Sequence, residues 1–111
     1  MNTSVEGRGD VTIVHVAGSV DGLTAEDLQR VFTSEAEAGH HRLIADFGEV
    51  DYTSSAGLRV LLATLKRARS GEGDLRLAVL RPEVRKVLGL SGFTGILSVY
   101  ATVDDAVRSF R

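Results

Sequence analysis

Hydrophobic and polar positions in the first half of the chain alternate with the two-residue period of β-strands. Residues 11–17 present two apolar-rich faces, which predicts a strand that ends at Gly18. Residues 5–8 precede it across the turn-like pair 9–10, so we expect these two segments to form a hairpin. Residues 43–47 are almost continuously apolar, as expected of a central strand that is covered on both faces.

Four other segments carry the three-to-four-residue period of helices. Thr24 is the expected N-cap of the first helix, which has acidic residues in its first turn and ends at Gly39. Pro82 and Thr102 begin two short helices, the second with Asp105 placed for a capping box. The predicted core positions of the four helices are Leu28, Val31, Phe32 and Ala36; Leu58, Leu61, Leu62 and Leu65; Val84, Val87 and Leu88; and Val103, Ala106, Val107 and Phe110.

Two more strands are expected at residues 75–80 and 97–100, so strands and helices alternate through most of the chain. That order predicts one α/β domain over residues 1–111, with a mixed four- to five-stranded sheet and about four helices packed on it. An apolar content of 43% and a charged content of 25% are ordinary for a globular domain of this kind.

Charge and composition exclude several function classes. A net charge of −2 favours neither nucleic acid nor an anionic membrane as a partner. The apolar runs are too short to span a bilayer, and the N-terminal residues lack the pattern of a signal peptide. The absence of cysteine excludes disulfides and thiolate metal sites and fits a reducing cytosol, so we expect a cytoplasmic protein. We expect no metal and no cofactor, because the adjacent pair His40 and His41 cannot easily aim at one ion.

Three hydroxyl residues, Thr53, Ser54 and Ser55, stand where the central strand gives way to the leucine-striped helix. One interpretation is structural, since serine and threonine are ordinary helix caps. The other is that the small residues Ala56 and Gly57 leave the Ser55 hydroxyl open to a second macromolecule. A phosphate placed there would face unpaired helix N–H groups, which bind anions well.

A hydrolytic role for Ser55 is disfavoured. The nucleophile elbow of serine hydrolases has glycine two residues before the serine, and here that residue is Thr53. A catalytic triad also needs a nearby histidine. His15 lies within a predicted strand, and His40 and His41 lie at the opposite end of the central strand from Ser55.

Asp21 and Arg59 are the other candidate site residues. Asp21 lies in a glycine-flanked loop, where it is either a turn or cap carboxylate or a neighbour of Ser55. The second interpretation requires the strands that end at Ala17 and Phe47 to meet at one sheet edge. Arg59 and Lys66 share a face of the second helix, which is either a solvated face or half of a charged docking surface.

Three blocks of the chain, residues 18–28, 52–62 and 90–110, resemble the STAS family and, within it, the bacterial anti-sigma factor antagonists. The middle block is similar to the family's phosphorylation motif, an aromatic residue followed by Asp or Ser, Ser, a small residue, Gly and Leu. The resemblance implies that Ser55 is the phosphoacceptor and that Asp21 matches a loop aspartate beside it. Many members have Asp immediately before the acceptor, whereas this chain has Ser54.

The resemblance also implies a non-enzymatic regulator. Its unphosphorylated form would bind an anti-sigma factor that is also a serine kinase, and so free the sigma factor. Phosphorylation would end the signal, and a PP2C-type phosphatase would restore it. We expect a monomer or weak dimer whose partner-binding residues are Asp21, Thr53, Ser54, Ser55, Ala56, Gly57 and Arg59.

Two alternatives remain open: a STAS subunit of a transporter or lipid-transport complex and, less favoured, a small serine hydrolase. The presence of Gly57 is explained either by a positive φ angle or by close approach of a partner to bare backbone. We favour close approach, which predicts that Gly57→Leu would weaken binding without altering the melting curve.

Overall fold

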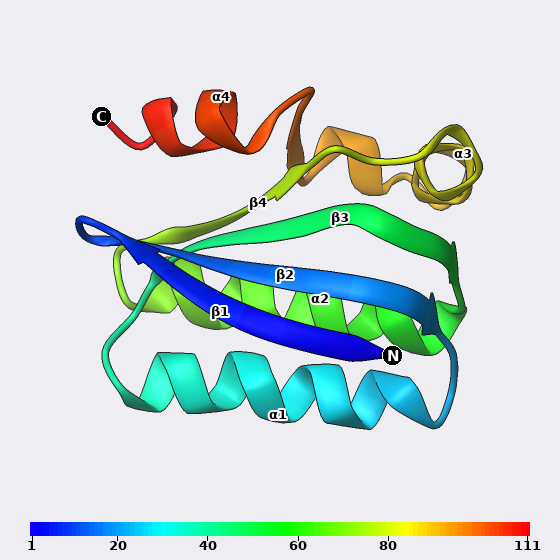
Figure 1. Cartoon of the computed structure of the whole chain (residues 1–111), viewed down its shortest axis with the longest axis horizontal. Helices are drawn as coiled ribbons and strands as arrows, with labels where there is room; N and C mark the ends of the chain where they lie inside the picture. Colours follow the sequence, from blue (N-terminus) through cyan, green and yellow to red (C-terminus); the bar gives the residue numbers. More distant parts are fainter.

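The computed structural model describes residues 1–111 apart from the side chain of Thr94. Five strands and four α-helices alternate along most of the chain, with one short 3-10 helix before the last strand (Figure 1). The strands are β1 (Asn2–Arg8), β2 (Val11–Val20), β3 (Arg42–Thr53), β4 (Asp74–Ala78) and β5 (Ser98–Tyr100). The helices are α1 (Thr24–Glu37), α2 (Ser55–Ser70), α3 (Pro82–Leu90) and α4 (Val103–Arg108), and the 3-10 helix is η1 (Phe93–Gly95).

The strands form one sheet in sequence order, β1-β2-β3-β4-β5. The hairpin strand β1 is antiparallel to β2, and every other neighbouring pair is parallel. The parallel strands are joined by α1, α2 and α3, as βαβ units require. The prediction of one α/β domain with a mixed sheet is therefore confirmed.

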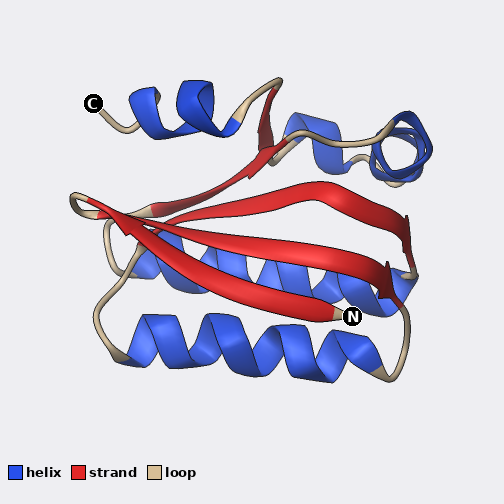
Figure 2. Ribbon diagram, viewed as in Figure 1, coloured by secondary structure: helices blue, strands red, loops and turns tan.

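Helices α1 and α2 lie side by side under one face of the sheet (Figure 2). Their apolar stripes and the inward-facing strand residues form the larger core, to which α3 adds Val84 and Leu88. Helix α4 packs on the opposite face, where Ala106 and Val107 join a smaller apolar cluster with β2, β3 and β4. The part of that face over β1 and β2 that α4 does not cover is polar.

Both central strands are longer than the sequence predicted. β2 does not end at Gly18, which adopts a φ of +97° inside the strand, but continues to Val20. β3 does not end at Phe47 but runs on to Thr53. Two register shifts, between His15 and Ala17 and between Ala17 and Ser19, let β3 accommodate extra residues opposite β2. Apolar periodicity breaks at such irregularities, which is why the pattern was lost there.

Smaller boundary errors occur toward the C-terminus. The predicted strand 75–80 ends at Ala78, because Val79 turns to a φ of 62°. Gly89 lies inside α3 rather than ending it. Thr102 caps α4 as predicted, accepting a hydrogen bond from the Asp105 amide at 3.0 Å. The Asp105 carboxylate pairs with Arg108, so the reciprocal bond of a capping box is replaced by an ion pair.

Candidate functional site

The β2–α1 and β3–α2 junctions lie next to one another at the carboxyl ends of β2 and β3. The last residues of the two strands, Val20 and Thr53, are register partners. The Ser54 amide then donates to the Val20 carbonyl at 2.8 Å, which ties the two junctions together. Both α1 and α2 begin at this end of the molecule (Figure 2). The sequence placed both strand ends too early, but their predicted meeting at one sheet edge is correct.

The three hydroxyl residues of the junction have different environments. Thr53 is buried, with 3% of its surface exposed. Ser54 is the N-cap of α2, and its hydroxyl accepts from the Gly57 amide at 3.4 Å. Ser55 is the first helical residue and is exposed. The cap interpretation therefore applies to Ser54, and of the three residues only Ser55 is exposed, since Ser54 is half-buried.

Asp21 stabilises the start of α1. Its Oδ1 accepts hydrogen bonds from the backbone amides of Leu23 and Thr24, each at 2.9 Å. Thr24 was predicted as the N-cap but is the first helical residue, and its hydroxyl accepts from the Asp21 amide. These hydrogen bonds, first from the Thr24 amide and then from the Leu23 amide, hold the pKa of Asp21 below its ordinary value of 3.8. The carboxylate is thus charged and used within its own loop, which is the structural one of the two interpretations.

Asp21→Ala is expected to lower the thermal midpoint more than Asp21→Asn, because an asparagine oxygen can still accept from the two amides. Since folding lowers the pKa of Asp21, its charge contributes stability above the unfolded pKa near 3.8, and this contribution is lost as pH falls through the folded pKa. Thermal melts between pH 2 and pH 7 measure both effects. Equal midpoints for wild type and Asp21→Ala at pH 7 would show that the loop does not need the carboxylate.

Gly57 contradicts the expectation of close partner approach to bare backbone. It is buried, and it is not among the glycines with positive φ. A Cβ at this position would lie 2.4 Å from Thr53 Oγ1 and 2.8 Å from Val20 Cγ1. Glycine is therefore required by the packing of α2 against the ends of β2 and β3. Ala56 beside it is half-buried.

The exposed surface around Ser55 contains residues that sequence reasoning missed. Leu23 is 84% exposed and Tyr52 is 52% exposed, one in each of the two adjoining junctions. Leu23 already has helical backbone angles, and the cap hydrogen bonds at the start of α1 come from Asp21 instead. The exposed leucine therefore has no part in capping the helix. Arg59 is exposed one turn after Ser55, at the spacing that puts both on the same helix face.

The histidines lie away from this site. His15 contacts Glu6 and Asp46, with both ring nitrogens engaged. His40 pairs with Glu35, and the His41 ring packs beside Gly71 at the far end of α2. No histidine of the described part of the chain is hydrogen-bonded to Ser55, so no hydrolytic triad forms there. The described residues also hold no cluster of three or more metal-ligating side chains.

Known proteins resemble this chain along its whole length. The STAS domain profile matches residues 2–106. The chain belongs to the STAS domain family. It is 34% identical to a candidate anti-sigma factor antagonist, BtrV, of Bordetella bronchiseptica, with 100% of this chain and 96% of the relative aligned. It is 30% identical to a candidate anti-anti-sigma factor of Mycobacterium tuberculosis, with 96% of this chain and 74% of the relative aligned.

A solved anti-sigma factor antagonist from Mycobacterium paratuberculosis superposes on this STAS domain with a TM-score of 0.89 at 28% identity. The match covers 97% of this chain and 92% of the other. With these relatives, the domain falls among the anti-sigma factor antagonists, which are regulators rather than enzymes. No helix in the described part of the chain is long and apolar enough to cross a membrane.

Proposed function

We propose that this STAS domain acts by partner switching: its unphosphorylated form binds an anti-sigma factor that is also a serine kinase, and phosphorylation of Ser55 ends that binding. A PP2C-type phosphatase would reverse the modification. The observation that carries the proposal is the exposure of Ser55 at the first position of α2, beside two hydroxyl residues that are buried or used as a cap. A kinase active site can reach Ser55 without unfolding the junction.

The junction is built so that a phosphate on Ser55 would spare the fold. Three features hold the junction without using the Ser55 side chain: the Ser54 cap, the hydrogen bond from the Ser54 amide to the Val20 carbonyl, and the buried Thr53. A phosphate at the start of a helix is also favoured by the helix dipole and its free N–H groups. Phosphorylation would thus change the charge of the surface and leave its shape intact.

The surface around Ser55 supports binding to another protein. Leu23 and Tyr52 are exposed apolar side chains on either junction, and tyrosine is enriched among the residues that dominate binding energy at interfaces. Exposed Arg59 adds a charge on the Ser55 side of α2. An interface centred here would place Ser55 among apolar contacts, where a phosphate would be costly to desolvate.

The proposal is tested by phosphopeptide mapping. An anti-sigma factor kinase captured by the unphosphorylated domain is purified and incubated with it and Mg-ATP, and the product is digested and sequenced. We expect one phosphate, on Ser55. The matched control is Ser54→Ala, which should remain a substrate. Ser54 is the cap of α2, and loss of this cap lowers the stability of the fold by only about 1 kcal/mol. Modification confined to Thr53 or Ser54 would overturn the assignment.

A further inference from the structure

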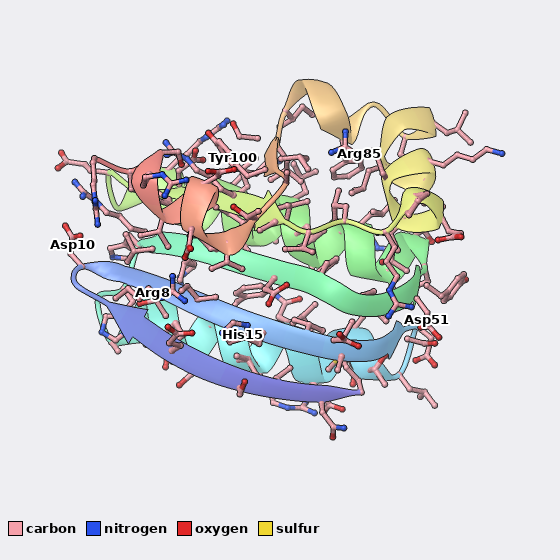
Figure 3. The ribbon with its side chains drawn as sticks, turned by 45° about the horizontal axis from the view of Figure 1, so that its top comes forward. Arg8, Asp10, His15, Asp51, Arg85 and Tyr100 are labelled. Carbon is pink, nitrogen blue, oxygen red and sulfur yellow. The ribbon has the colours of Figure 1, made fainter. Side chains whose placement is uncertain are left out.

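A chain of charged side chains crosses the polar face of the sheet, away from the proposed phosphorylation site. Asp46 of β3 contacts His15 of β2, and His15 contacts Glu6 of β1. Glu6 then pairs with Arg8 at 2.6 Å, and Arg8 pairs with Asp104 of α4 at 2.6 Å. Figure 3 shows Arg8 and His15 along β1 and β2, with Asp51 at the other end of the sheet. The chain links three strands and a helix.

The central member of this chain, His15, is placed between two carboxylates. Its Nδ1 lies 2.7 Å from Asp46 Oδ2, and its Nε2 lies 2.9 Å from Glu6 Oε1. A neutral imidazole has one N–H donor, so it can hydrogen-bond to only one carboxylate and turns a lone pair toward the other. Both contacts are hydrogen bonds only when the ring carries two protons. The geometry therefore favours the imidazolium form.

Apart from its backbone ladder and the Arg8 pair with Asp104, the strand held by this contact has few packing contacts of its own. Six of the seven residues of β1 are exposed, and only Glu6 is half-buried. β1 is also an edge strand, paired with β2 alone. Segments with few buried contacts open locally at low free-energy cost. A lost side-chain link would therefore affect β1 before the buried strands.

We propose that His15 is a pH-dependent latch: its imidazolium fastens edge strand β1 to β3 through Glu6 and Asp46, and loss of its proton loosens β1. A neutral ring donates to only one of the two carboxylates and turns a lone pair toward the other. The Arg8 contacts to Glu6 and Asp104 persist, so β1 loosens without the sheet being lost.

The other charged groups on this face do not replace the proton of His15. Glu49 lines the open groove of about 250 Å³ beside His15 and adds a further negative charge. Arg81 is turned toward the Gly48 carbonyl at 3.0 Å and toward Glu49 at 3.6 Å. Because a third of the His15 side chain is exposed, its proton can exchange with solvent.

The sign of the pH effect follows from the balance of contacts on His15. Burial by itself lowers the pKa of His15, but the hydrogen bonds from the ring to Glu6 and Asp46 outweigh it and raise the pKa above the ordinary 6.5. A group whose pKa rises on folding stabilises the fold fully below its unfolded pKa. This stabilisation is lost as pH rises through the folded pKa. The latch is thus closed below pH 6.5 and opens as the pH rises through the folded pKa of His15, which lies above 6.5.

Opening of β1 would also reach the β2–α1 junction. Met1, which precedes β1, packs against the larger core and lies beside Gly18, where a Cβ would be 3.3 Å from Met1 Cα. Loosening β1 therefore uncovers the part of β2 that leads to Asp21. The proposal rests on the His15 contacts alone and does not require Ser55 to be phosphorylated.

The latch is tested on the full chain by NMR and by amide hydrogen exchange. We expect the pKa of His15 to lie above 6.5, and Glu6→Gln to lower it. Protection of the β1 amides, corrected for intrinsic exchange, should fall between pH 5.5 and pH 8.5. The expected fall is up to about tenfold for each unit by which the pKa of His15 exceeds 6.5. The β4 amides should keep their protection.

His15→Gln is the test variant and His40→Gln is its matched control, because the His40 ring pairs with Glu35 and lies outside the chain of charges. His15→Gln should show the same low β1 protection at both pH values, whereas His40→Gln should behave as wild type. The titration of wild type needs no mutant and decides the matter even if His15→Gln fails to fold. A His15 pKa below 6.5, or β1 protection equal at both pH values in wild type, would overturn the proposal.

Discussion

Gly57→Leu is expected to lose the native fold, and Gly57→Ala is expected to lose stability. The site of a new Cβ lies 2.4 Å from Thr53 Oγ1 and 2.8 Å from Val20 Cγ1. Val20 and Thr53 are the last paired residues of β2 and β3, and both are buried. Both side chains are buried between the strand ends and α2, so displacing them disturbs the packing at this junction.

The magnitude follows from the cost of overpacking. A single extra methyl group in a filled core costs about 1–3 kcal/mol, which exceeds the up to about 1 kcal/mol that alanine gains over glycine in a helix. Gly57→Ala should therefore be destabilised despite its better helix propensity. Gly57→Leu adds three more carbon atoms and should exceed about 4 kcal/mol, the range in which a small domain unfolds.

Gly89→Ala is the matched control, since Gly89 also lies within a helix but has nothing within 4 Å of a new Cβ. It should be stabilised by a few tenths to about 1 kcal/mol. Urea unfolding of the three variants and wild type measures the differences. A Gly57→Leu variant with a native melting curve would show that the junction is looser than its packing indicates, and would revive partner approach as the reason for glycine.

The predicted fold was correct where periodicity is strong, and the two largest errors, at the ends of β2 and β3, share one physical cause. Three of the four predicted core leucines of α2, Leu58, Leu61 and Leu65, are buried, whereas Leu62 is only half-buried. The apolar run of β3 follows from burial on both faces. The ends of β2 and β3 were placed too early because register shifts occur in these segments and several of their last residues are exposed. Both features break the simple alternation of apolar and polar residues. Pairing of two strands far apart in the sequence cannot be read from either strand alone.

The candidate site divides in the same way. That the loops carrying Asp21 and Ser55 adjoin could be predicted from their positions after two parallel strands. The different roles of Thr53, Ser54 and Ser55 could not be predicted from the sequence. They depend on the residue at which the first turn of α2 begins, and an error of one residue changes all three. Gly57 was misjudged for a related reason: a glycine is required by the atoms that would meet its side chain, and those atoms come from β2 and β3.

Phosphorylated protein is expected to bind the anti-sigma factor kinase about a thousandfold more weakly than unphosphorylated protein. This corresponds to a loss of several kcal/mol of binding free energy, since each tenfold change in affinity is about 1.4 kcal/mol. The phosphate adds about −1.5 to −2 charges to Ser55. Asp21 of the adjoining junction is already negative, and its pKa is held low by hydrogen bonds from the Thr24 and Leu23 amides. An interface over both groups would remove the water that screens their repulsion and would desolvate the phosphate beside Leu23 and Tyr52, and both effects oppose binding.

Ser55→Ala separates the charge of the phosphate from loss of the hydroxyl. Because Ser54 and not Ser55 caps α2, Ser55→Ala should melt close to wild type and bind the kinase persistently. Ser55→Glu should bind weakly, whereas Ser34→Glu, which adds the same charge to an exposed position of α1, should bind as wild type. Calorimetric titration of each form with the purified kinase gives the affinities. If Ser55→Ala has a native melt yet does not bind, the hydroxyl itself is a contact, and charge alone does not explain the switch.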